Sequence, residues 1–163
     1  SRRLHDSVEL SRKALAIDDS QYSAWRTLAE SLRWTPGMRE SSRSAYRKCI
    51  ELISEDLAES RSDGSAGDPV LLSDLATFHV SLGEFNEAKS LLAEVEKRPH
   101  LEIAAMFNLA AAYEEMQDRD SAMVWLEKAV AADLSLAQVE RYPGLRNLVA
   151  HPRFQALREQ YEK

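Results

Sequence analysis

The stretch LSDLATFHVSLGEFNEAKSLLAEV, at residues 72–95, returns in altered form as MFNLAAAYEEMQDRDSAMVWLEKA at residues 106–129. Apolar and small residues of the two copies match at a constant offset, as in Leu72 with Met106, Ala88 with Ala122, and Val95 with Ala129. A fixed period of about 34 residues is typical of repeat proteins built from stacked helix pairs. The sequence therefore predicts an all-α chain whose helices pack mainly on neighbours along the sequence.

The same register extends toward the N-terminus, and it breaks after Ala132. The interval from Ala14 to Trp25 equals the interval from Val95 to Met106, so an earlier helix and turn follow the same pattern. Apolar residues at steps of three and four, with Gly and Pro at the breaks, set the helix limits. We expect helices over 4–17, 20–34, 39–60, 69–82, 84–97, 100–116 and 119–132, followed by shorter ones over 136–141, 145–149 and 152–161.

One interval departs from the repeat. The interval from Cys49 to Leu72 is more than twice the equivalent interval from Val95 to Met106. Ile53 and Leu57 continue the apolar stripe, which predicts that the helix over 39–60 runs about two turns beyond the usual end. The polar stretch SRSDGSAGD at residues 60–68 has no periodicity and is typical of a loop.

These residues and spacings resemble the tetratricopeptide repeat (TPR) family, whose pattern has a period of about 34 residues. The resemblance implies a right-handed superhelix of antiparallel helix pairs in a single TPR domain over 1–163. Its expected parts are a half repeat (1–19), a repeat with an extended second helix (20–62), a loop (63–68), two repeats (69–99 and 100–134) and a helical C-terminal cap (135–163). The tail resembles those that follow bacterial TPR arrays, which suggests the C-terminal segment of a larger signalling protein.

Composition excludes several classes of function. A net charge of −6 argues against a nucleic-acid partner, because phosphate contacts need clustered Lys and Arg. No apolar run approaches the ~18 residues that would predict membrane insertion. The single cysteine, Cys49, excludes an internal disulfide and fits a reducing compartment, so we expect a cytoplasmic protein.

Catalytic and metal chemistry find little support in the sequence. The four histidines (His5, His79, His100 and His151) are far apart and lack the spacing of metal ligands. Cys49 falls at a small core position, and Asp118 and Asp120 fit the N-terminus of a helix. No phosphate-binding loop or nucleophile motif is present. We therefore expect no enzyme activity, no catalytic residues, no metal and no cofactor.

The TPR resemblance also implies where a partner would bind. In that family, ligand contacts come mainly from outward positions of each first helix, which form a concave groove. The matching positions here are Arg26, Glu30, Arg33, Trp34, Ser73, Thr77, Val80, Phe107, Asn108, Ala111 and Glu114. Trp34 is either an exposed aromatic anchor or packs against the adjacent turn; the sequence leaves both open.

The sequence thus predicts a non-catalytic protein–protein interaction scaffold that binds a peptide or partner protein in its concave groove. Two alternatives remain: a self-association module that forms a homo-oligomer, and an enzyme or metal-binding protein.

Overall fold

The computed structural model describes residues 2–62, 64 and 66–161, and the side chains from residue 5 onward. These residues form the helices α1 (Arg2–Ile17), α2 (Tyr22–Arg33), α3 (Arg39–Arg61), α4 (Pro69–Leu82), α5 (Phe85–Glu96), α6 (Ile103–Glu115), α7 (Arg119–Ala131), α8 (Leu136–Arg141), the 3₁₀ turn η1 (Pro143–Leu145), α9 (Arg146–Val149) and α10 (Pro152–Tyr161). Residues 63 and 65 of the predicted loop lie outside the described residues.

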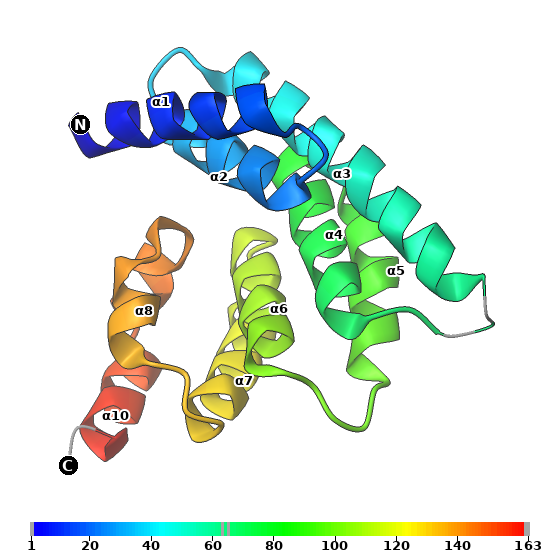
Figure 1. Cartoon of the computed structure of the whole chain (residues 1–163). Coiled ribbons are helices and arrows are strands. Elements are labelled where there is room, and N and C mark those ends of the chain that lie inside the picture. The colour runs from blue at the N-terminus through cyan, green and yellow to red at the C-terminus, as the bar shows by residue number, and fades with distance from the viewer. Residues whose placement is uncertain (1, 63, 65, 162–163) are drawn as a thin grey trace.

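The helices pack in sequence order. α1 packs on α2, and the pairs α2–α3, α4–α5 and α6–α7 follow one another around a curve (Figure 1). The pairs are joined because α3 contacts α4 and α4 contacts α6. The chain is therefore an all-α helical repeat of the TPR-like kind that the sequence predicts. Among the described residues, no helix is both long and apolar enough to cross a membrane.

Local sequence explains where the helices begin and end. The Asp68 carboxylate accepts a hydrogen bond from the Val70 amide at 2.7 Å, and Pro69 occupies the first position of α4. α4 ends at Gly83, whose φ of 81° lies in the left-handed region. The equivalent position one repeat later is Gln117, which keeps the same geometry with a φ of 67°. The turn is therefore retained although the second copy has a side chain at this position.

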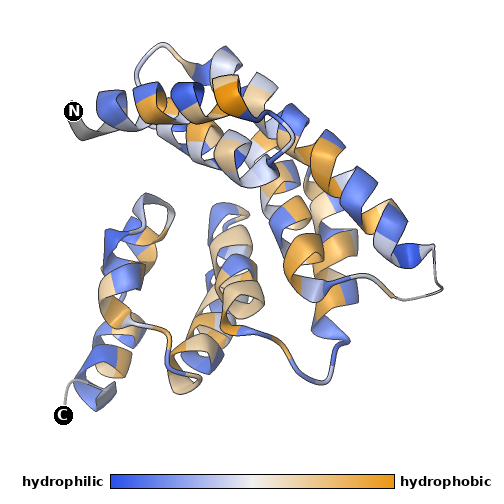
Figure 2. Ribbon diagram, in the orientation of Figure 1, coloured by the Kyte–Doolittle hydropathy of each residue, from blue (hydrophilic) through white to orange (hydrophobic). Residues whose placement is uncertain are grey.

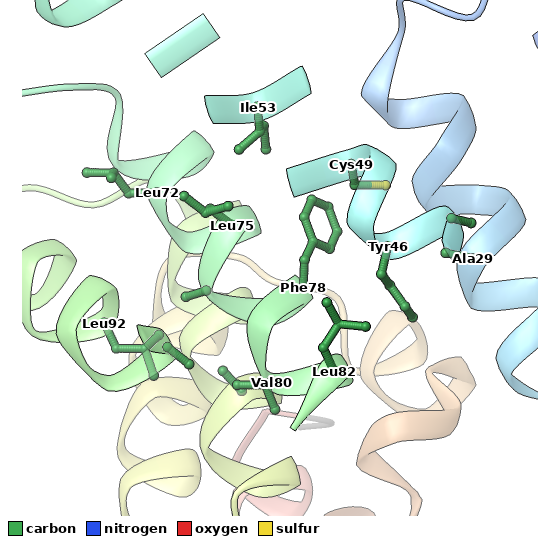
Figure 3. Close-up of a cluster of buried hydrophobic side chains, with 14 of the residues drawn as sticks. Ala29, Tyr46, Cys49, Ile53, Leu72, Leu75, Phe78, Val80, Leu82 and Leu92 are labelled. Atoms are coloured by element: carbon green, nitrogen blue, oxygen red, sulfur yellow. The ribbon is translucent and has the colours of Figure 1, made fainter. Parts of the chain in front are cut away.

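The long helix is present as the apolar stripe predicts. α3 continues past Cys49 to Arg61, and Ile53 is buried in the same cluster as Leu72 of α4 (Figure 3). Leu57 belongs to this cluster as well. Hydrophilic and hydrophobic residues alternate along its ribbon (Figure 2). The extension thus lengthens the contact between the first repeat and the second.

The hydrophobic core divides into two clusters that meet at α6. The first runs from Val8 on α1 to Leu109 and Ala112 on α6. The second starts at Met106 and Ala110 on α6 and continues into the C-terminal segment. The small residues at close helix crossings are fully buried; they are Ala76, Ala88, Ala110 and Ala122. Adjoining sides of one helix therefore serve both halves of the core.

The C-terminal segment packs on the last repeat. Phe154 and Leu157 of α10 are buried in the second cluster, as expected of a cap. The Arg153 guanidinium donates to both oxygens of Glu127 on α7 at 2.8 and 3.0 Å. α8 to α10 therefore cover the apolar end of the helix stack.

Candidate functional site

A cavity of about 690 Å³ lies between the inner helices and the C-terminal segment; we call it the inner cavity. Side chains at steps of three and four along α2, α4 and α6 share one face of each helix and line it together. The lining comprises Tyr22, Arg26, Glu30, Val70, Asp74, Thr77, Ile103, Ala104, Phe107, Asn108, Leu134, Gln138, Arg141 and Tyr142.

Asp74 organises one wall of the inner cavity. Its carboxylate is buried on α4 and accepts three hydrogen bonds, from the Tyr22 hydroxyl at 3.0 Å, Arg26 at 2.9 Å and the Asn108 amide at 2.7 Å. The donors come from α2 and α6, so one carboxylate on α4 links three helices. Burial and the nearby Asp74 charge raise the pKa of Tyr22 to about 12, so its hydroxyl stays protonated and donates.

Tyr142 forms the opposite wall. Its ring packs edge-on against Phe107 of α6, with centroids 5.3 Å apart and planes at 72°. Burial raises its pKa, and the nearby carboxylate of Glu30 raises it further. The C-terminal segment therefore does more than cover the end of the stack, because it supplies an aromatic boundary to the concave face.

Glu30 is the carboxylate of the inner cavity that has no partner. It is half-buried on α2, and it makes no hydrogen bond or ion pair with any other residue of the described chain. Burial raises its pKa, the Asp74 charge adds to the increase, and Arg26 and Arg33 oppose it.

Arg33 and Trp34 lie at a second cavity of about 580 Å³, near the turn that follows α2. Arg33 donates to both oxygens of Glu115 at 2.9 and 2.6 Å, and to the Ser81 hydroxyl at 3.0 Å. Trp34 is 42% exposed, and the Arg33 guanidinium carbon lies 5.2 Å from its ring centroid. Trp34 is therefore accessible to solvent, and its role as an anchor for a partner stays a prediction.

The groove positions expected from the sequence fall into three groups. Arg26, Glu30, Thr77, Phe107 and Asn108 come together in the inner cavity. Arg33 and Trp34 line the second cavity instead.

The third group was expected at outward positions of the first helices, but its members are buried; they are Ser73, Val80, Ala111 and Glu114. The Ser73 hydroxyl donates to the Val70 carbonyl and accepts from Asn108, while both Glu114 oxygens accept from Arg119. Val80 belongs to the first core cluster and Ala111 to the second, which includes the C-terminal segment. These side chains make contacts within the fold, Val80 also lines the second cavity, and a role of the four in binding stays a prediction.

Sequence reasoning missed Tyr22, Asp74 and Tyr142. Asp74 carries the one charge within the apolar run of α4, and an acidic residue at a core position is a signal for buried hydrogen bonding. Tyr142 follows the last repeat, where the repeat period gives no guidance. Its place can only be read from the way the C-terminal segment packs.

The other candidate residues have structural partners. Cys49 is fully buried and free, and burial raises its pKa to about 12, which disfavours the nucleophilic thiolate. His79 bonds to Glu84 at 2.7 Å, and His151 accepts from the Arg153 amide near the start of α10. Asp118 accepts from the Ser121 amide at the start of α7, as predicted. No group of three or more potential metal ligands converges in the described part of the chain.

Comparison with known proteins identifies one repeat directly. Residues 103–135, which span α6, α7 and the turn after them, match the family model described as tetratricopeptide repeat. No curated protein and no solved structure matches the chain.

Proposed function

Residues 103–135 are a tetratricopeptide repeat, and we propose that the chain is a non-catalytic interaction module that binds a segment of a partner protein in the inner cavity. Such repeats are generally protein–protein interaction modules. The repeat model covers α6 and α7, and α6 contributes Phe107 and Asn108 to the cavity. The proposed site therefore includes part of the matched repeat.

The observation that carries this proposal is the fixed geometry around Asp74. Tyr22, Arg26 and Asn108 are held by hydrogen bonds before any ligand arrives. A preformed site loses little side-chain freedom on binding, so more of the contact energy appears as affinity. The cavity volume of about 690 Å³ falls in the usual range for ligand sites. Tyr142 closes one side, so a short stretch of the partner would enter the cavity.

A random peptide library displayed on phage tests the proposal. Peptides selected on the wild-type chain should fail to bind Thr77→Arg, because Thr77 lines the cavity and an arginine there fills it. Ser54→Arg is the matched control, since it adds the same side chain at an exposed position of α3. Circular dichroism melting of each variant shows that the fold is kept. If Thr77→Arg binds every selected peptide as well as the control does, the inner cavity is not the binding site.

Self-association is a second candidate. Leu10 and Ile17 of α1 are 66% and 89% exposed, and their spacing of seven residues places them on one face of the helix. A second copy packing on this face would bury them. Sedimentation velocity over a range of concentrations, repeated with Leu10→Gln plus Ile17→Gln, tests this candidate. A wild-type chain that stays monomeric at the highest concentration excludes it.

A further inference from the structure

Glu30 has two arginines within reach on its own helix, and both are already engaged. Arg26 lies one turn before it and Arg33 one turn after it. The Arg26 guanidinium bonds to Asp74 at 2.9 Å, and that of Arg33 bonds to Glu115 at 2.6 Å. Among the described residues of the concave face, two ion pairs therefore flank one carboxylate that makes no ion pair of its own.

This arrangement leaves a local negative charge where solvent is limited. A half-buried carboxylate loses part of its hydration, and a cation brought beside it recovers favourable interaction. The ionised form of Glu30 carries that unbalanced charge, and burial raises its pKa. The same cavity is lined by the rings of Tyr22, Phe107 and Tyr142. Aromatic faces attract lysine and arginine side chains and shield their methylene groups from water.

Arg141 is the remaining charged residue of the lining, and its positive charge favours an anionic ligand. It is exposed on α8, so solvent and salt screen its charge more strongly than that of Glu30. The deeper part of the cavity is therefore governed by Glu30, while Arg141 acts at the rim.

We propose that the inner cavity takes the cationic side chain of a lysine or arginine from the partner segment, with Glu30 as its counter-ion and the rings of Phe107 and Tyr142 as walls. This inference rests on the proposed function, because it names the chemistry of the partner at the same site. The inference predicts a basic residue in the partner segment. This agrees in sign with the net charge of the chain, which is −6.

The phage library distinguishes this inference from the proposed function. Peptides that bind the wild type and fail on Thr77→Arg should share a lysine or arginine at one position. A synthetic copy of such a peptide should bind Glu30→Gln about tenfold more weakly, as should a copy with norleucine at the basic position on the wild type. Combining both changes should add little further loss, because each removes the same charge pair.

Glu55→Gln is the matched control, since Glu55 is an exposed carboxylate on α3, and it should leave the affinity unchanged. Glutamine keeps the size of Glu30, and melting curves report whether the fold is kept. Cavity-dependent peptides without a shared basic residue, or with equal affinity for wild type and Glu30→Gln, overturn this inference and leave the proposed function standing. A library that yields no cavity-dependent peptide overturns both.

Discussion

Arg33 and Glu115 lie 82 positions apart in the chain, and their side chains form a two-pronged ion pair that joins the end of α2 to the end of α6. The same guanidinium also donates to Ser81 on α4, so one side chain links three inner helices. Asp74 makes an equivalent three-helix connection at the inner cavity. The inner helices are thus linked by polar contacts at two levels along their length.

Arg33→Met should lower the free energy of unfolding by about 1 kcal/mol, because the pair is partly exposed and water compensates some of the loss. Urea unfolding of Arg33→Met, Glu115→Gln and the double variant measures the coupling between the two side chains. We expect a coupling of about 0.5–1 kcal/mol that shrinks at high salt. Additive effects of the two changes would mean that the ion pair itself contributes nothing.

Asp74→Asn should cost about 2 kcal/mol, because an amide of the same size cannot accept from all three donors. Urea unfolding gives the change in free energy. Asp6→Asn, at an exposed position of α1, is the control and should stay within about 0.5 kcal/mol of the wild type. Equal stability of the two variants would show that the Asp74 hydrogen bonds do not stabilise the fold.

Cys49 should make the folded state lose stability in alkali. Burial raises its pKa from 9.0 to about 12, so between these values the folded chain keeps a proton that the unfolded chain has released. The unfolded state binds fewer protons there, and stability therefore falls with rising pH, by up to about 1.4 kcal/mol per pH unit. The contribution is fully present below the unfolded pKa of 9.0.

Cys49→Ala removes the contribution of Cys49 to the pH dependence of stability and leaves the contribution of the tyrosines. The difference in unfolding free energy between wild type and Cys49→Ala should therefore change above about pH 9 and stay constant below it. Thiol labelling of the wild type at neutral pH should be slow until denaturant is added. Rapid labelling of the folded chain would contradict the burial of this thiol.

Phe154→Ala should cost about 3–5 kcal/mol, because the ring is fully buried between α10 and the rest of the second cluster. Hydrogen exchange of Phe154→Ala, followed by mass spectrometry and compared with the wild type, should be accelerated more in α8 to α10 than in α2 to α5. Tyr161→Ala, at a residue 45% exposed, is the control on the same helix. Unchanged protection of α8 to α10 in Phe154→Ala would show that this segment is held in place by other contacts.

Much of the helical framework could be predicted from the sequence, because apolar periodicity and turn residues are local signals. The Asp68 cap, the Gly83 turn and the length of α3 all depend on residues within a few positions of one another. The constant offset between the copies then brings Leu72 and Met106 to equivalent places on α4 and α6. Each of these inferences needs only local spacing or the comparison of one copy with the next.

The candidate site was predicted less completely because it depends on contacts between distant parts of the chain. Positions such as Glu114 were assigned by repeat register, which cannot tell that Arg119 turns back to engage the carboxylate. The register also says nothing of Tyr142, because the C-terminal segment has no counterpart within the repeats. Glu30 was named from its position in the repeat. That it makes no ion pair follows only from the structure, because its neighbouring arginines are paired with Asp74 and Glu115.

The division of the core at α6 affects the order in which the parts of the chain can fold during synthesis. The first cluster includes Leu109 and Ala112, so its packing cannot be completed until α6 has left the ribosome. Once that helix is in place, its adjoining side presents Met106 and Ala110 to the segments that are synthesised next. The segments that follow α6 are therefore added to a surface that the earlier helices have already begun to form.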